Sequence, residues 1–125
     1  LILIMEGIVD VNNEIARFPV VRSNLAEMMR IGILRGKFVI IGTYLPVNPD
    51  GFRVFAVENI ARLNDVIRQE AKGKNVPIAD HEVAAPKGFR GLGSDGVHPN
   101  NLGYETMAQV WFESIVEVLE GLGVT

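Results

Sequence analysis

The chain has 125 residues, of which 12 are basic and 15 are acidic, and its formal net charge is −3. This near balance provides no basic field for nucleic acid, so we expect no nucleic-acid partner. The sequence contains no cysteine, which excludes disulfides, thiolate catalysis and cysteine metal sites. No apolar run reaches the roughly 20 residues that are needed to cross a bilayer, so we expect no membrane span.

Apolar stretches of strand and helix type alternate along the chain, at a length typical of one domain. We expect strands over residues 1–5, 38–44 and 76–79, and helices over about 18–34, 52–71 and 101–119. The strands are almost continuously apolar, which is typical of parallel strands covered on both faces. Gly36 and Gly73 are expected to end the first two helices. The pattern predicts one α/β domain over residues 1–125, a doubly wound parallel sheet of about three strands with helices on both faces.

Two of these helices carry apolar stripes at helical spacing. In the helix over 52–71 the stripe consists of Ala56, Ile60, Leu63, Ile67 and Ala71. In the last helix it consists of Tyr104, Met107, Ala108, Trp111, Ile115 and Val118. Such stripes are more often core faces than ligand platforms, so we expect both to pack against the sheet.

The segment Asp95-Gly96-Val97-His98-Pro99 places a carboxylate and an imidazole three residues apart, just before the last helix. In a turn of this length the Asp95 carboxylate can accept the Nδ1 proton of His98, which leaves Nε2 free to take a proton from a nucleophile. The alternative is a pair of surface residues at the start of a helix, with Asn100 or Asn101 as the N-cap.

Segments at both ends of the chain together resemble conserved blocks of the SGNH, or GDSL, ester hydrolase family. Near the start, an apolar strand leads into Gly7-Ile8-Val9-Asp10, which is similar to the third block of the family. Near the end, Asp95-Gly96-Val97-His98-Pro99 continues to Gly103-Tyr104 and Met107-Ala108, which is similar to the fifth block. The resemblance implies a flavodoxin-like sheet with the strand order 2-1-3-4-5. It also implies hydrolysis of carboxylic esters, as by an esterase or lipase, through a Ser-His-Asp triad.

The same resemblance implies roles for individual residues. His98 would be the general base, and Asp95 would orient it. Gly7, Val9 and Asp10 would mark the oxyanion region. The substrate would be a small ester, with no cofactor. We also expect no metal, because the chain has only two histidines and they lie in no metal-ligand spacing.

The sequence departs from the family pattern in two places. It contains no Gly-Asp-Ser motif, which in the family carries the nucleophilic serine, so we expect the carboxyl-terminal part of a larger hydrolase domain. Val9 stands where the third block has an asparagine that donates a hydrogen bond to the oxyanion, and valine has no donor. Asn12 or Asn13 could be a substitute donor, although polar residues after a strand are more often loop or cap residues.

Neither the three serines of the chain nor Thr43 is a clear replacement for that serine. Ser23 and Ser114 fall within predicted helices. Ser94 adjoins Asp95, whose carboxylate would repel a developing oxyanion. Thr43 lies at the carboxyl end of the second predicted strand, nearer the expected site, but no base is evident beside it.

Asp80 and His81 form a second pair of an acid and an imidazole, directly after the third predicted strand. Neighbouring side chains in an extended segment point to opposite faces, which argues against a mutual acid–base pair. We therefore expect His81 to be a loop residue and not a catalytic one.

Without the first two strands of the resembled sheet, residues 1–5 would be an unpaired apolar edge. We expect this strand to pair with another chain, either the missing amino-terminal portion or a second copy that makes a homo-oligomer. Two functional interpretations stay open: part of an ester hydrolase, or a non-catalytic remnant or pseudoenzyme that acts in oligomerisation or ligand binding. A flavodoxin-like receiver or nucleotide binder is less favoured, because the chain has no Gly-rich phosphate loop.

Overall fold

The computed structural model describes residues 1–11, 17–53 and 56–123. The strands are β1 (Ile2–Ile4), β2 (Val39–Gly42) and β3 (Ile78–Ala79), and the helices are α1 (Ile8–Val11), α2 (Phe18–Leu34), α3 (Ala56–Lys74), α4 (His81–Ala84) and α5 (Asn101–Gly121). The strands form a parallel sheet in the order β1-β2-β3, with Ile2 opposite Val39 and Ile41 opposite Ile78.

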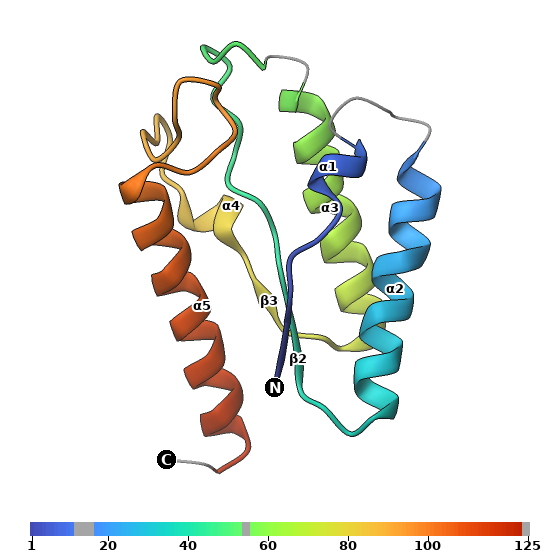
Figure 1. Cartoon of the computed structure of the whole chain (residues 1–125). Helices are drawn as coiled ribbons and strands as arrows, with labels where there is room; N and C mark the ends of the chain where they lie inside the picture. The colour runs from blue at the N-terminus through green and yellow to red at the C-terminus, as the bar shows by residue number, and fades with distance from the viewer. Residues whose placement is uncertain (12–16, 54–55, 124–125) are drawn as a thin grey trace.

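Helices cover both faces of this sheet (Figure 1). α2 and α3 pack together on one face, and α4 and α5 lie on the other. The predicted fold class is therefore confirmed. α2 has the predicted bounds, whereas all three strands are shorter than predicted. Among the described helices, none combines the length and apolar character that a membrane span requires.

The larger part of the core lies between the sheet and the layer formed by α2 and α3. The stripe predicted for α3 is confirmed, because Ala56, Ile60, Leu63, Ile67 and Ala71 are all buried. These side chains belong to one cluster with Leu25 and Met29 of α2 and Ile41 of β2. Burial of each large apolar side chain contributes roughly 1.5–3 kcal/mol to folding, so this layer holds the strands in place.

α2 and α3 are both followed by a residue with a positive φ, but only the end of α2 was predicted correctly. After α2, Gly36 takes a positive φ of 66°, and the Lys37 amide donates to the Gly32 carbonyl at 3.0 Å. α3 continues past Gly73 to Lys74, and Asn75 takes the left-handed conformation, with φ 53°. Asparagine tolerates this conformation better than other residues that have a Cβ. The prediction of Gly73 as the stop was therefore wrong.

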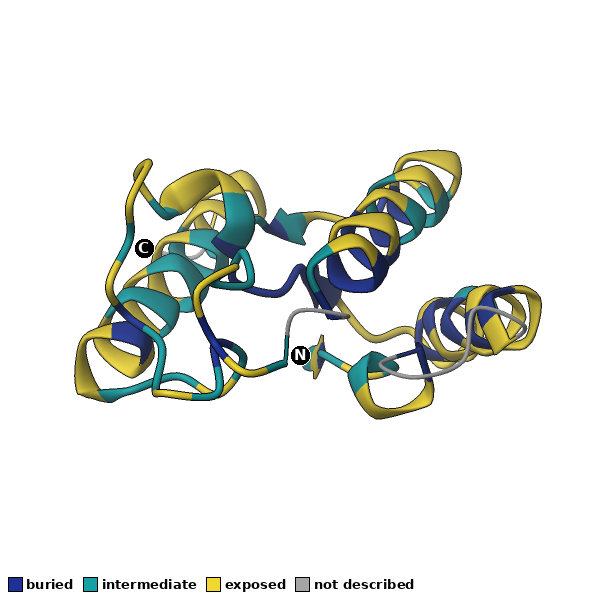
Figure 2. Ribbon diagram, turned by 90° about the horizontal axis from the view of Figure 1, so that it is seen from above, coloured by how far each residue is buried: buried dark blue, intermediate teal, exposed yellow. Residues whose placement is uncertain are grey.

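α5 is much less buried than α3. Its predicted core stripe is only partly right: Met107, Trp111, Ile115 and Val118 are half-buried, whereas Tyr104 and Ala108 are exposed. Figure 2 shows few fully buried residues in this helix, which lies opposite α2 and α3. The physical reason is the placement of α5, which packs on α4, β3 and β2. Leu3 of β1 stays 45% exposed.

His81 is not the loop residue predicted from the sequence. It is the first residue of α4, it is fully buried, and its ring lies 5.1 Å from that of Trp111 in an edge-on arrangement. Gly42 makes room for both rings, because a Cβ there would lie 2.6 Å from Trp111 Cζ2. Neither imidazole nitrogen has a hydrogen-bond partner among the described residues. Burial lowers the pKa of His81 to about 4, so the ring is neutral at pH 7.

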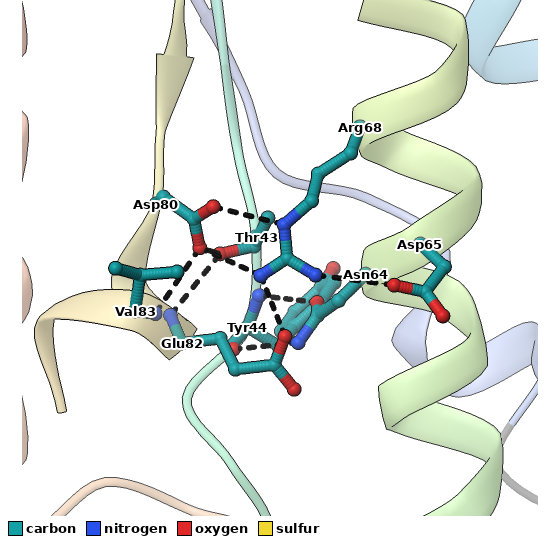
Figure 3. Close-up of polar contacts among 8 residues, drawn as sticks. All are labelled: Thr43, Tyr44, Asn64, Asp65, Arg68, Asp80, Glu82 and Val83. Atoms are coloured by element: carbon teal, nitrogen blue, oxygen red, sulfur yellow. Dashed lines mark hydrogen bonds and ion pairs between the residues drawn. The ribbon is translucent and has the colours of Figure 1, made fainter. Parts of the chain in front are cut away.

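A network around Arg68 ties α3 to the ends of β2 and β3 (Figure 3). The Arg68 guanidinium donates to Asp80 at 2.9 Å and to Glu82 at 2.6 Å. The Asp80 carboxylate also accepts from the Thr43 hydroxyl at 2.9 Å and from the Val83 amide at 3.2 Å. Burial alone would raise the pKa of Asp80, but the hydrogen bonds from Arg68 and Thr43 lower it. Asp80 is therefore a structural anion that caps α4.

The neutral, buried state of His81 predicts a loss of stability on mild acidification. The unfolded chain takes up this proton near the ordinary pKa of 6.5, whereas the folded chain resists it down to about 4. As the pH falls below 6.5 the unfolded state is favoured, and we expect the free energy of unfolding to drop by roughly 2–3 kcal/mol between pH 7 and 4.5. Urea unfolding at several pH values measures this drop. His81→Leu should remove most of it, and an equal drop in that variant would exclude His81 as its source.

Candidate active site

A cleft of about 590 Å³ opens at the carboxyl ends of β1 and β2. One wall is the turn after β1, with Gly7 and Val9, and the other is the loop before α5, with His98. Tyr44 and Arg53 line it from the segment after β2. Open parallel sheets bind their ligands at this edge. The structure thus brings together two segments that lie about 90 residues apart in sequence, and it places both at the expected edge of the sheet.

Within that loop, Asp95 and His98 face each other. Asp95 Oδ2 lies 2.5 Å from His98 Nδ1. The other oxygen, Oδ1, accepts from the backbone amides of Val97 and His98, each at 3.0 Å, which is the local turn that aspartate side chains commonly form. The Asp95 side chain is only 12% exposed and the His98 ring is 70% exposed. The carboxylate is therefore fixed by the loop, while the far side of the imidazole stays accessible.

The electrostatics of the pair favour an ionised Asp95. The hydrogen bond from the Val97 amide is the largest cause that lowers the pKa of Asp95 to about 2, with the His98 side chain and amide adding to it against the effect of burial. An anionic carboxylate can hold the Nδ1 proton of His98 and stabilise an imidazolium. The predicted N-cap is also present, since the Asn100 side chain accepts from the Gly103 amide at 3.1 Å.

Arg53 is a neighbour of this pair that sequence reasoning missed. Its Nε lies 3.3 Å from Asp95 Oδ2, and its backbone amide donates to the Asp95 carbonyl at 3.2 Å. The Asn48 amide donates to the Gly96 carbonyl at 2.9 Å, so the segment after β2 is docked onto the loop that carries the pair. An isolated arginine in a turn-rich segment offers no sequence signal for such a contact.

The predicted oxyanion region forms the turn between β1 and α1. Gly7 has a φ of 110°, and a Cβ there would lie 2.8 Å from Val21 Cγ1, so both conformation and space favour glycine. Val9 follows in α1 and is 84% exposed, with no side-chain donor. Asp10 is exposed in the same helix. The predicted substitute donors Asn12 and Asn13 lie outside the described residues.

None of the candidate hydroxyl groups joins the site. Ser23 is exposed in α2 and Ser94 is exposed in the loop before Asp95. The Ser114 hydroxyl donates to the Val110 carbonyl within α5 at 2.9 Å. Thr43 is fully buried, and its hydroxyl donates to Asp80 and accepts from the Glu82 amide. All of these lie outside the lining of the cleft. Across the described ranges, no three acidic or histidine side chains gather as a possible metal site.

Tyr44 is the second cleft residue that sequence reasoning missed. It lies two residues after the end of β2, and it is only 8% exposed although it lines the cleft. Its backbone amide donates to Asn64 Oδ1 at 2.7 Å, and Asn64 Nδ2 donates to its carbonyl at 2.9 Å. The only sequence signal was its position at the carboxyl end of a predicted strand.

The chain has recognisable relatives in sequence and structure. Residues 1–106 match the family described as GDSL-like Lipase/Acylhydrolase. The fold is similar to that of a GDSL-like lipase from Bacteroides thetaiotaomicron, with a TM-score of 0.75 and 25% identity over 95% of this chain and 63% of that one. It is also similar to an acetylxylan esterase from Geobacillus stearothermophilus, with a TM-score of 0.67 and 20% identity over 90% of this chain and 57% of that one. The chain thus spans less than two thirds of the length of these structures. No curated protein gave a significant match.

The hydrogen bonds of Asp95 predict that Asp95 and His98 differ in their contribution to stability. Asp95→Ala removes the acceptor of two backbone amides, so we expect a loss of about 1–3 kcal/mol in the free energy of unfolding. His98→Ala removes a largely exposed ring, and we expect a change within about 0.5 kcal/mol. Urea denaturation of both variants measures this difference. Equal losses would contradict the view that the carboxylate holds the loop.

Proposed function

Because the chain belongs to the GDSL-like lipase/acylhydrolase family, we propose that it takes part in the hydrolysis of small carboxylic esters, with His98 as general base and Asp95 as its orienter. The observation that supports this most strongly is the hydrogen bond between Asp95 and His98 Nδ1 at the mouth of the cleft. That bond selects the tautomer with a free Nε2, the nitrogen that a general base needs.

In the proposed reaction the attacking group is a serine-type hydroxyl. As its oxygen bonds to the ester carbonyl carbon, its proton moves to His98 Nε2, and the resulting imidazolium is stabilised by the ionised Asp95. His98 then returns the proton to the leaving alkoxide as the carbon–oxygen bond of the ester breaks. Water repeats the sequence on the acyl intermediate and releases the carboxylic acid.

We further propose that this hydroxyl is carried by a strand that pairs with the free edge of β1. β1 pairs with β2 on one side and has no other strand partner among the described residues. Leu1 and Leu3 are exposed beside that edge. The related structures are longer than this chain, so they have room for such a strand. A strand added here would end beside the cleft, at the same edge as Gly7 and His98.

Removal of the imidazole tests the catalytic proposal. We expect His98→Ala to abolish ester hydrolysis by the assembled enzyme, and Asp95→Asn to lower kcat by about 10²–10⁴-fold, because the base loses its orientation and its counter-charge. Release of p-nitrophenol from a short-chain p-nitrophenyl ester gives both rates. His81→Leu, which lies outside the cleft, is the control for general effects of losing a histidine. Hydrolysis that persists unchanged in His98→Ala excludes the proposed base.

The free edge of β1 predicts association of the isolated chain. We expect it to self-associate through this strand in solution, and we expect Leu3→Lys to make it monomeric, since a charge on an edge strand opposes pairing. Size-exclusion chromatography with light scattering measures the mass. Val83→Lys, at an exposed position of α4, is the matched control. A wild-type chain that is monomeric, or a Leu3→Lys variant that associates equally, would count against pairing through β1.

The second candidate function is ligand binding without catalysis. It is favoured by the lack of a serine among the described residues that line the cleft and by the missing donor at Val9. Under this alternative the cleft binds esters or carboxylic acids, and the rate of ester hydrolysis is the same with and without His98.

A further inference from the structure

Two loops pack backbone against backbone beside the proposed base. One is the segment 48–53, which follows β2, and the other is the loop 93–98, which precedes α5 (Figure 1). Gly51 is buried at their contact, and a Cβ on it would lie 2.5 Å from Gly96 Cα and 2.6 Å from the carbonyl carbon of Asp95. The φ of Gly51 is not positive, so glycine is required here for space. A larger residue at this position would force the two backbones apart.

Gly96 completes this contact from the other loop. Its φ is 81°, and a Cβ on it would lie 2.6 Å from the carbonyl oxygen of Asn48. Two backbone hydrogen bonds flank the paired glycines. The Asn48 amide donates to the Gly96 carbonyl at 2.9 Å. The Arg53 amide donates to the Asp95 carbonyl at 3.2 Å. The peptide unit between Asp95 and Gly96 is therefore held by contacts from outside its own loop.

The segment 48–53 is itself tied to the core. The Arg53 carbonyl accepts from the Ala56 amide at the start of α3, at 2.9 Å, and Ala56 is fully buried. The Asn48 side chain accepts from the Asp50 amide at 3.0 Å, which is the local turn that asparagine commonly forms. The loop that carries the proposed base is thus fixed by α3 through this segment, in addition to its direct connection to α5.

The orientation of the His98 ring depends on that loop because little else holds the ring. The ring is 70% exposed, and Asp95 Oδ2 is its one hydrogen-bond partner among the described residues. A Cβ at position 51 would meet the backbone between the acid and the imidazole. Relief of that clash would turn the carboxylate relative to the ring. A misplacement of about 1 Å at a reacting group can cost roughly 10²-fold in rate.

We propose that Gly51 is a positioning residue for the base: its close packing against Gly96 sets the orientation in which Asp95 faces His98. This inference rests on the proposed function and adds to it a residue that lies outside the lining of the cleft. Gly51 takes no part in the proton transfer. It acts through the backbone of residues 95 and 96, and so determines where His98 Nε2 meets the hydroxyl of the nucleophile.

The tautomer of His98 gives a test on the chain alone, without turnover. A neutral imidazole with a carboxylate at Nδ1 keeps its proton there, whereas a ring without that partner exchanges between both tautomers. The ¹⁵N shifts of the ring nitrogens in mildly alkaline solution report this ratio, and His81→Leu assigns the signals. We expect Nδ1–H to be the main form in the wild-type chain, and we expect Gly51→Ala to lower its share towards an equal mixture.

The kinetic test is the separation of kcat from KM in the assembled enzyme. We expect Gly51→Ala to lower kcat by about 10²-fold and to leave KM within about twofold, because the base acts on the nucleophile and does not bind the ester. Gly73→Ala is the matched control, since a Cβ at that exposed position on α3 would meet nothing within 4 Å. We expect it to leave kcat and the tautomer ratio as in the wild type.

A milder variant covers the case in which Gly51→Ala does not fold. Asn48→Ala removes the acceptor of the Asp50 amide and adds no atom to the contact between the loops. We expect it to lower kcat by about threefold, the loss for one neutral hydrogen bond, and to shift the tautomer ratio in the same direction as Gly51→Ala. Circular dichroism establishes which variants are folded, and the folded ones decide.

The outcomes distinguish this inference from the function on which it rests. His98-dependent hydrolysis, with kcat and the tautomer ratio unchanged in the folded variants, overturns the role of Gly51 and leaves the hydrolase proposal standing. A change in KM at constant kcat also overturns that role. A tautomer ratio that depends on Gly51, in a protein without any His98-dependent hydrolysis, overturns the hydrolase proposal and supports the positioning of the ring.

Discussion

The parallel pairing of β1 with β2 determines where every residue of the candidate site lies. Because both strands run in the same direction, the chain leaves them at the same edge of the sheet. The turn at Gly7 and the buried Tyr44 therefore become neighbours, although they lie in different crossover units. The loop before α5 returns to this edge and adds His98. If β1 ran in the opposite direction, the turn at Gly7 would lie at the other end of the sheet, away from the His98 imidazole.

At this edge, the Asp95 carboxylate binds both the backbone of its own loop and the His98 imidazole. One oxygen of its carboxylate holds two backbone amides, and the other faces His98 and Arg53. The geometry of the base is thus coupled to the local folding of its own loop. Arg53 links that loop to the segment after β2, so the positions of the base and of the β2 edge are not independent.

The sequence was sufficient to predict the fold because the relevant signals are local and periodic. Apolar strands and the stripe on α3 identified the sheet and its inner face correctly. The stripe on α5 was only half right, because periodicity shows which side of a helix is apolar and does not show how far the neighbouring layer extends. His81 was misjudged for a related reason: its burial depends on Gly42 and Trp111, which lie far from it in the chain.

The candidate site was predictable only where a short motif carries it. The acid and imidazole of residues 95 and 98 lie within one turn, so their spacing indicates the contact. Arg53 reaches Asp95 across more than 40 residues. Tyr44 lines the same cleft as the turn after β1 because β1 and β2 are paired, and no local spacing encodes that. The end of α3 shows the same limit. Whether the helix ends at Gly73 or continues to Lys74 depends on how it meets the next strand, which the local sequence does not indicate.

The short length of β1 has a consequence for selectivity. Three residues offer only a few backbone groups to an added strand, and a ladder of that size is marginal in water by itself. Recognition of an incoming segment must then come mostly from apolar side chains that pack against the exposed Leu1 and Leu3. Other extended peptides would make too few contacts to bind. The short edge therefore limits non-specific aggregation but still allows pairing with a complementary sequence.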